Sequence, residues 1–326
     1  MSNGLHKTSG RWRLGLALSL ITVATWGVLP VFLRLLMESL DIGTITWYRF
    51  LMAGGFTAGL LIRTGSLPSL RKVTKAQLGL FIIAATGLCG NYVLFLLGLE
   101  RMGAASAQVV IQLGPLFLLL GGLVVFREPF SRRQGIGVAV FVCGMALFFN
   151  QRLDELFSEG SDYGIGALLI VAAAGAWSCY ALAQKQLLHS YSSSQILLLL
   201  YATAVLVYTP TASPMSVLEL GGFEIFLLLF CGANVIIAYG CFTEAMAHWE
   251  ASRVSATLAL VPLVTLVFME LCGRFLPRIS EAEDLNAIGW LGAALVVGGS
   301  MQCALGSRPR TDLETEAEAD ELANLE

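Results

Sequence analysis

The sequence predicts an all-α membrane protein whose ten transmembrane helices form two inverted five-helix repeats. The chain of 326 residues is 56% hydrophobic and only 13% charged, so a soluble domain would have too little polar surface to cover itself. Ten apolar runs are long enough to cross about 30 Å of hydrocarbon at about 1.5 Å per residue. In addition, the hydrophobic pattern of residues 78–127 returns 147 positions later.

The ten expected spans follow one another with short connections. In order, they cover residues 14–37, 44–62, 78–98, 104–126, 134–150, 164–187, 194–212, 223–246, 251–272 and 285–305. The first span follows basic residues as a signal peptide would, but it is too long and lacks a small-residue cleavage site, so we expect it to be retained. The short loops around 99–103 and 247–250 leave a helical hairpin open as an alternative, whereas the repeat favours ten separate spans.

The repeat also predicts how the two halves are related. Its landmarks match in the order Tyr92, Phe95, Pro115 and Arg127 against Tyr239, Phe242, Pro262 and Arg274. Because five helices is an odd number, the second half must enter the membrane from the opposite side, which makes the repeats inverted. The chain therefore divides into an N-terminal segment 1–13, a first repeat 14–150, a linker 151–163, a second repeat 164–305 and an acidic tail 306–326 that we expect to be disordered.

An excess of basic residues on one side of the expected spans predicts their orientation. The richer side holds Lys7, Arg11, Arg13, Arg63, Arg71, Lys72, Lys75, Arg127, Arg132, Arg133, Lys185, Arg308 and Arg310. The poorer side holds Arg101, Arg152, Arg274 and Arg278. We expect the richer side, with both termini, to be cytoplasmic and the linker 151–163 to be external. The expected location is a multi-pass position in a cell membrane, specifically a bacterial inner membrane.

Several short motifs occur in a characteristic order along the chain. They are Trp26-Gly27, Arg49-Phe50, the alanine-rich run 103–107, Pro115 and Glu128. In this order the chain resembles the drug/metabolite transporter superfamily and, within it, the EamA-type exporters, over about residues 14–305. The resemblance implies a ten-helix fold, a central cavity lined by helices 1, 3, 4, 6, 8 and 9, and export of small organic solutes, often amino acids or their relatives. The second half departs from the pattern, because the position equivalent to Glu128 is occupied by Phe275.

Two glutamines are candidate substrate-binding residues, because polar side chains inside apolar helices avoid lipid and face the protein interior. Gln108 and Gln112 share one face of the fourth expected span with Pro115. The matching positions of the ninth span are Ser255 and Ala259, so a polar wall faces a nearly apolar one. Such walls suit an amphipathic solute. The alternative is that the glutamines only join helices by hydrogen bonds, worth about 0.6 kcal/mol each.

Aromatic and amide side chains in the other interior helices extend the predicted site. The further candidates for substrate binding are Trp26, Asn91, Tyr92, Trp177, Asn234 and Tyr239. A tyrosine can stack on a ligand and orient its polar group, and the two tryptophans lie deeper than the interfacial belt where tryptophan is expected. Ordinary packing between helices is the alternative for each of them.

Pro115 and Pro262 match across the repeat and are predicted hinges. Each proline removes one backbone hydrogen bond and frees a carbonyl one turn earlier, which in a membrane helix must find another partner. A matched pair favours hinges, because each half must bend alike in opposite states. Helix curvature without a function is the alternative.

Two glutamates within the expected spans are candidates for proton coupling. Glu270 lies in an apolar stretch eleven residues beyond Ala259, close to the same helical face, and Glu244 is the second candidate. The alternatives are local i, i+4 pairs with Arg274 and His248.

Arg49 is expected at the outer interface, near Glu38 or Asp41, as an anchor rather than as a substrate ligand. The reason is that an arginine at mid-membrane costs about 2.5–3.5 kcal/mol. An anionic solute passing outward would still meet it there.

No other chemistry is indicated by the sequence. The seven cysteines have no paired spacing, the three histidines form no metal-binding pattern, and no nucleotide-binding signature occurs, so we expect no metal, no cofactor and no ATP-driven pump. The predicted partners are a small-molecule solute and the lipid bilayer, not nucleic acid, with monomer and homodimer both open. The predicted function is secondary transport of a small organic solute across the cytoplasmic membrane, by alternating access of the two repeats. The alternatives are a passive facilitator or channel, or a non-transport membrane protein such as an intramembrane enzyme, for which no catalytic set is visible.

Overall fold

The computed structural model describes residues 11–68, 73–125, 130–249, 251–275 and 285–305. Expectations for Glu128, Arg127, Arg278 and the acidic tail 306–326 lie outside these residues. The elements are α1 (Trp12–Leu36), α2 (Ile42–Arg63), α3 (Lys75–Met102), α4 (Ala104–Val110), α5 (Leu113–Val125), α6 (Arg132–Phe148), α7 (Leu153–Phe157), α8 (Asp162–Leu187), α9 (Ser193–Tyr208), η1 (Pro214–Glu219), α10 (Gly222–His248), α11 (Ala251–Leu258), α12 (Val261–Phe275) and α13 (Ala287–Leu305).

Every element in the described ranges is helical, as the sequence predicts. Eight spans are long and apolar enough to cross a membrane, with α4–α5 and α11–α12 each counted as one span. The two remaining spans are shorter, since α6 has 17 residues and α9 has 16. Large apolar side chains cover the outer faces of the spans, for example Leu168, Leu206 and Phe56, which are 71%, 74% and 57% exposed. The prediction of an all-α membrane protein with two five-helix halves is confirmed.

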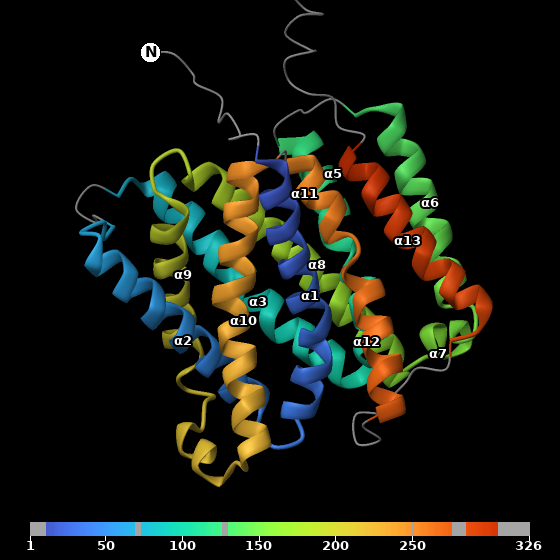
Figure 1. Ribbon diagram of the computed structural model, residues 1–326, viewed down its shortest axis with the longest axis horizontal. Coiled ribbons are helices and arrows are strands. Elements are labelled where there is room, and N and C mark those ends of the chain that lie inside the picture. Colours follow the sequence, from blue (N-terminus) through green and yellow to red (C-terminus); the bar gives the residue numbers. More distant parts are fainter. Residues whose placement is uncertain (1–10, 69–72, 126–129, 250, 276–284, 306–326) are drawn as a thin grey trace, which may run out of the picture.

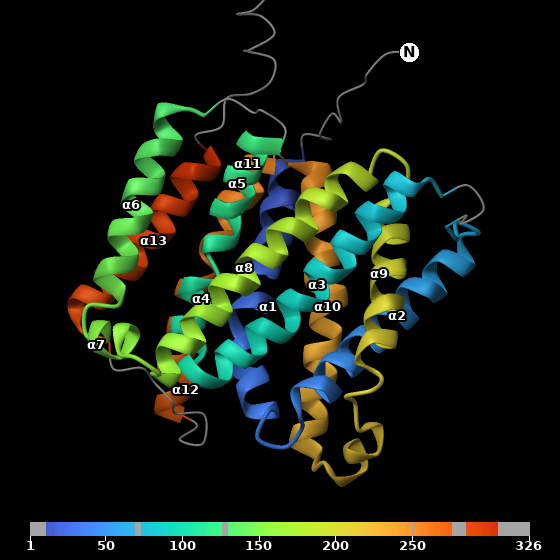
Figure 2. The same cartoon turned by 180° about the vertical axis from the view of Figure 1, so that it is seen from behind.

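Two pairs of neighbouring helices form opposite faces of the bundle. Helix α1 lies beside α10 on the face shown in Figure 1, and α3 lies beside α8 on the face shown in Figure 2. Helices α2 and α9 close one edge of the bundle, and α6 and α13 close the other. Each of these pairs joins a helix of the first half to one of the second. Inverted repeats produce this arrangement, because the packing of α3 on α8 reappears as the packing of α10 on α1.

Capping boxes fix where several helices begin. Thr74 and Ser192 accept hydrogen bonds from the backbone N–H groups of Gln77 and Gln195, whose side chains accept from the capping residues in return. The same glutamines also join the two halves. The amide of Gln77 donates to Ser190 Oγ at 3.0 Å, and that of Gln195 donates to the Ser66 carbonyl at 2.9 Å. One end of the α2–α3 loop is therefore held against the α8–α9 loop.

Glycines allow α6 and α13 to pack with their backbones in contact. A Cβ atom on Gly292 would lie 2.2 Å from Phe148 N, and one on Gly144 would lie 2.5 Å from Val296 N. Gly299 repeats the contact further along, where a Cβ would lie 2.5 Å from Phe141 N. Small residues promote helix association in lipid because they let backbones approach closely. This edge of the bundle is therefore held by backbone packing rather than by large side chains.

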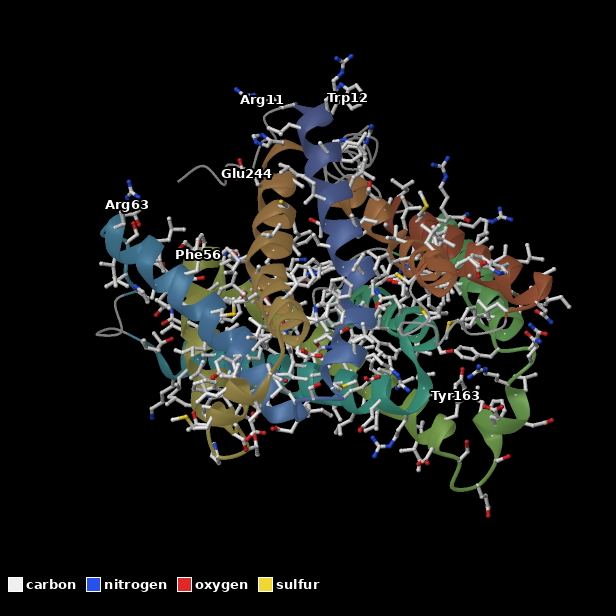
Figure 3. The ribbon with its side chains drawn as sticks, turned by 60° about the horizontal axis from the view of Figure 1, so that its bottom comes forward. Arg11, Trp12, Phe56, Arg63, Tyr163 and Glu244 are labelled. Carbon is white, nitrogen blue, oxygen red and sulfur yellow. The ribbon has the colours of Figure 1, made fainter. Side chains whose placement is uncertain are left out.

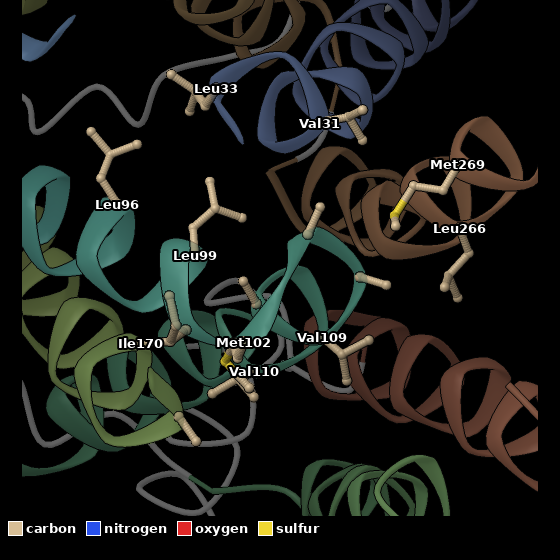
Figure 4. Close-up of a cluster of buried hydrophobic side chains, with 14 of the residues drawn as sticks. Val31, Leu33, Leu96, Leu99, Met102, Val109, Val110, Ile170, Leu266 and Met269 are labelled. Atoms are coloured by element: carbon tan, nitrogen blue, oxygen red, sulfur yellow. The ribbon is translucent and has the colours of Figure 1, made fainter. Parts of the chain in front are cut away.

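The larger buried cluster lies between α1, α3, α4, α8 and α12. Figure 4 shows its centre, where Leu99 and Met102 of α3 lie near Val109 and Val110 of α4 and Ile170 of α8. A second cluster surrounds Phe50 and is rich in tyrosine. It joins α2, α3, α8, α9 and α10 at the opposite edge from the glycine contact.

The structure departs from the expected spans in five places. The spans expected at 104–126 and 251–272 are each two helices, because the chain leaves helical geometry between Val110 and Leu113 and between Leu258 and Val261. Helix α3 runs to Met102, beyond the expected end at 98, and Gly103 ends it with a φ of 84°, a conformation that glycine adopts without strain. The short helices α7 and η1, in the linker 151–163 and after α9, were not expected from the sequence.

Candidate functional site

The two broken spans meet at the centre of the bundle. Gln112 lies in the break between α4 and α5, and its Nε2 donates a hydrogen bond of 3.2 Å to the carbonyl of Ala259, which lies in the break between α11 and α12. The two residues are 147 positions apart, which is the period of the repeat. Equivalent residues of the two halves can touch only where the pseudo-twofold axis passes between them. The axis therefore passes through the two helix breaks.

Pro115 and Pro262 lie in the first turns of α5 and α12. The sequence suggested that each proline bends one continuous helix. Instead, each stands at the start of a new helix, where its missing N–H removes no intrahelical bond. The break residues themselves carry the change of direction. A role for the two prolines as hinges stays a prediction.

Tyr92 of α3 and Tyr239 of α10 form a second contact between equivalent residues. Their hydroxyl groups are hydrogen-bonded to each other, and they too are 147 positions apart. Tyr239 also packs edge to face on Trp26 of α1, with ring centroids 5.6 Å apart, and Trp26 contacts Phe242 at 6.2 Å. Both Trp26 and Tyr239 are half-buried. The structure thus brings together three of the residues predicted for the site.

Arg49 is buried in the bundle, and the expectation of an interfacial anchor is wrong. Only 4% of the residue is exposed, its Nε donates to the Cys231 carbonyl of α10 at 3.3 Å, and its Cζ lies 4.8 Å from the centre of the Tyr92 ring. Asp41 does not pair with it but caps α2, accepting from the backbone N–H of Thr44 at 2.8 Å. The span begins at Ile42, so Arg49 lies two turns, or about 10 Å, along the helix.

The amide groups of Asn91 and Asn234 join helices of the two halves. Asn91 Nδ2 of α3 donates to the Ala173 carbonyl of α8 at 3.0 Å, and Asn234 Nδ2 of α10 donates to the Thr25 carbonyl of α1 at 2.8 Å. The two bonds join equivalent pairs of helices, although Asn91 matches Ala238 rather than Asn234 in the 147-residue repeat. Both bonds agree with the alternative of interhelical packing for the two donors. Asn234 is 2% exposed, and its Oδ1 accepts no hydrogen bond from any described residue.

The residues after Trp26 and Trp177 bind the broken spans. Thr265 Oγ1 of α12 donates to the Gly27 carbonyl at 2.7 Å, and Ser178 Oγ of α8 donates to the Gly114 carbonyl of α5 at 2.9 Å. Trp177 is half-buried beside Gly114, where a Cβ atom would lie 3.2 Å from its ring. Each tryptophan therefore lies where an unbroken helix packs on a broken span.

Gln108 and Gln112 are buried, with 8% and 9% of each residue exposed. Gln112 joins the two breaks, as described above, so the helix-joining alternative holds for its Nε2 group. Gln108 lies in α4, one turn before the break. No contact joins either glutamine to the pair Tyr92 and Tyr239 among the interactions of the described residues, so these contacts divide the predicted site into two groups.

The two candidate proton carriers are not buried. Glu270 has an exposed side chain on α12, and the exposed Glu244 pairs with His248 at 3.0 Å, as the i, i+4 alternative predicted. The expectation of a buried Glu270 is wrong because the spacing from Ala259 was counted along one continuous helix. The break after Ala259 changes that phase, so the two residues no longer share a face.

Two further features lie apart from this site. A groove of about 400 Å³ lies between the start of α3 and α9, and its lining includes Lys75, Leu78, Phe81, Leu199 and Thr203. Within the described ranges, no group of three or more His, Cys, Asp or Glu residues could hold a metal ion.

Comparison with known proteins gives one consistent result. The EamA-like transporter family matches residues 13–150 and 164–302, that is, each half separately. The chain is 37% identical over 296 residues to a protein of Escherichia coli K12 named uncharacterized inner membrane transporter YhbE, covering 90% of this chain and 92% of that one. It is 35% identical to an uncharacterized transporter of Haemophilus influenzae, covering 90% and 96% of the two chains.

More distant likenesses agree with this result. A Salmonella typhimurium protein named probable amino-acid metabolite efflux pump is 22% identical over 311 residues, covering 90% of this chain and 95% of its own. A crystal structure superposes with a TM-score of 0.61 at 19% identity, covering 90% of this chain and 98% of the other. At this identity the superposition supports the fold alone.

Proposed function

Because the chain belongs to the EamA-like transporter family, we propose that it is a secondary transporter of a small organic solute that works by alternating access of its two repeats. A membrane transporter follows from the family; the solute and the mechanism are the proposal. Two halves of inverted topology can exchange their conformations, so that a site between them opens first to one side and then to the other.

The contact of equivalent residues on the pseudo-twofold axis is the observation that carries this proposal. Gln112 with Ala259, and Tyr92 with Tyr239, each join the two halves at the same depth. When the halves rock about this axis, contacts between them break on one side of the membrane and form on the other. The reverse motion restores the first state. The helix breaks next to Pro115 and Pro262 supply the points at which each half can bend, so these prolines are proposed to flank the hinges.

We propose that the solute is amphipathic, such as an amino acid or a related metabolite, and that it is exported. The buried polar groups Gln108, Gln112 and Arg49 come from the first half. In the second half, the positions that match the two glutamines are Ser255, which is exposed, and Ala259. The relative named as an amino-acid metabolite efflux pump supports this class of solute. Trp26, Trp177, Asn91 and Asn234 complete the proposed lining.

We propose that both termini are cytoplasmic in a bacterial inner membrane. Arg11, Trp12, Arg63 and Glu244 lie at one end of the bundle, and Tyr163 lies at the other (Figure 3). Cysteines introduced as Lys75→Cys and Asp154→Cys, in a background without accessible native cysteines, should react with an impermeant thiol reagent on opposite sides. Labelling of both from the same side would contradict the inverted orientation.

Transport is tested in two steps. Comparison of metabolites inside and outside cells with and without overexpression identifies the solute, which should accumulate in the medium. Counterflow of that labelled solute in proteoliposomes then separates a carrier from a channel, because only a carrier exchanges it against an unlabelled gradient. Flux without counterflow would instead support the second candidate, a passive facilitator or channel.

We propose Glu270 as the first candidate for proton coupling and Glu244 as the second. The exposure of both side chains does not support this role. If Glu270 carries the coupling proton, Glu270→Gln should abolish dependence on the proton gradient and preserve solute exchange. Full gradient-driven transport in this variant would exclude Glu270.

A further inference from the structure

Arg49 holds a buried positive charge that no carboxylate of the described residues neutralises. Its contacts are the Cys231 carbonyl and the Tyr92 ring, so one of its five N–H donors has an acceptor among the described residues. A charge inside a membrane protein is costly and marks an ion or substrate path when it has no internal partner. The two contacts orient the guanidinium but leave its charge without a counterion.

The surroundings of Arg49 connect it to the half-buried part of the site. From the guanidinium, contacts pass through the Tyr92 ring to Tyr239 and then to the Trp26 ring. Behind Arg49 the packing is dense, because Phe50 is fully buried against Tyr92 at a centroid distance of 4.5 Å and against Tyr201 at 5.7 Å. The contacts of Arg49 therefore lead toward the half-buried rings of Tyr239 and Trp26, which is the side on which we place a ligand.

We infer that Arg49 binds a carboxylate of the transported solute, so that the substrates are organic monoanions or zwitterions with an apolar part. This inference rests on the proposed function, since it assigns the ligand of that same site. A guanidinium binds a carboxylate with two parallel hydrogen bonds, and the pairing is strong where water is scarce. A single cation matches a single negative charge, which favours a carboxylate over a doubly charged phosphate. The apolar part of the solute then lies against Tyr239 and Trp26.

The test compares acids with their neutral amides on the purified full-length protein. The probes are two matched pairs, 3-phenylpropionate with 3-phenylpropanamide and hexanoate with hexanamide. Their dissociation constants are measured by titration calorimetry, with thermal unfolding as a second measurement. In the unaltered protein each acid should bind more tightly than its amide by roughly tenfold to a hundredfold, the factor expected for hydrogen bonds to a charged group.

Three variants separate binding from a structural role. Arg49→Gln should remove the preference for the acid, and Arg49→Lys should keep a reduced one, because lysine retains the charge but loses the two-pronged geometry. Tyr208→Phe is the matched control. It removes a buried hydrogen bond of 2.6 Å to the Cys89 carbonyl in the same cluster without changing the charge, so the preference should persist. A merely structural Arg49 would change acid and amide binding equally.

The outcomes that overturn the inference differ from those that overturn the proposed function. An acid that binds no better than its amide, including the case in which neither binds, overturns the inference, as does an acid preference that survives in Arg49→Gln. If Arg49→Gln does not fold, Arg49→Lys is compared with Tyr208→Phe. A larger loss of the acid preference in Arg49→Lys supports the inference, and an equal loss in the two variants overturns it. If the protein shows a clear acid preference but no counterflow, the proposed transport mechanism is contradicted, whereas the assignment of Arg49 as a carboxylate-binding residue stands.

Discussion

The two edges of the bundle are built in opposite ways. Where α6 meets α13, glycines bring the two backbones together, and no side chain larger than hydrogen fits at Gly144 or Gly292. Where α2, α3 and α10 meet, Arg49 lies against the Tyr92 ring, and the rings of Tyr92, Tyr201 and Tyr208 lie 4.5–6.1 Å from that of Phe50. The first edge fixes the distance between the halves. The second edge carries the buried charge of Arg49, which we propose recognises a solute.

This difference has a physical cause. In lipid, apolar side chains gain little by leaving the solvent, so close packing and hydrogen bonds decide which helices associate. A backbone contact has few alternative arrangements, and it resists deformation. A contact between side chains, such as Tyr92 with Tyr239, can break and form again when rings rotate. The two edges are therefore suited to a fixed support and to a changing site, respectively.

The largest effect should come from replacing a glycine of the α6–α13 contact. Gly292→Leu forces side-chain atoms into a space where even a Cβ would lie 2.2 Å from Phe148 N, so the halves must separate. We expect destabilisation of about 3 kcal/mol or more, or failure to assemble. The measurement is thermal unfolding with size-exclusion chromatography in detergent.

Gly298→Leu is the control for this prediction. Gly298 lies on the same helix, is exposed, and has no atom within 4 Å of an added Cβ. It should assemble and transport normally. Equal damage from both substitutions would mean that the glycine contact is not the reason for the loss.

A smaller effect is expected where the two breaks meet. Gln112→Leu removes the bond to the Ala259 carbonyl, leaves that carbonyl unsatisfied and makes the site more apolar. We expect transport to fall about tenfold, with a loss of only about 1 kcal/mol in stability. Transport rates in proteoliposomes and thermal unfolding measure the two effects. Unchanged transport would assign Gln112 to packing alone.

The hydrogen bond between Tyr92 and Tyr239 should give a still smaller, non-additive effect. Tyr92→Phe and Tyr239→Phe each remove the same bond, so the double variant should be no worse than either single one. The expected coupling energy is about 0.5–1.5 kcal/mol in thermal or chemical unfolding. Effects that simply add would show that the two hydroxyl groups act separately.

The smallest effect is expected at the pair of Glu244 and His248, in which the glutamate is exposed. Glu244→Gln removes a contact of 3.0 Å in which the glutamate is 62% exposed, so stability should change by less than about 1 kcal/mol. A transport rate that stays within about twofold of the unaltered protein would agree with a local helix pair. A large loss of transport would reopen its role in coupling.

Much of the architecture follows from the sequence because membrane spans obey simple rules. Length, apolar content and the 147-residue period predicted the helical class and the two halves, and the structure confirms both, although two of the expected spans are broken. The breaks at Gln112 and Ala259 were not predicted, since the apolar pattern continues through them. Glu270 was placed on the wrong face for the same reason, because helical spacing holds only within one continuous helix.

Arg49 shows where residue-by-residue reasoning fails. The cost of a charge in lipid argued for the interface, but the tertiary structure supplies the Cys231 carbonyl and the Tyr92 ring, from helices 182 and 43 positions away in the chain. The motif Arg49-Phe50 was the signal in the sequence that marked this position. The role of Arg49 depends on contacts with other helices, which the local sequence does not specify.

The sequence by itself determined the class of protein, the spans and the repeat, because hydrophobic length and periodicity are local properties of the chain. Only the tertiary structure decided which equivalent residues meet on the pseudo-twofold axis, where the helices break and which cation is buried without a carboxylate partner among the described residues. These features depend on distances between helices far apart in sequence. They are set by the packing of α3 on α8, of α1 on α10 and of α6 on α13, which no single segment specifies.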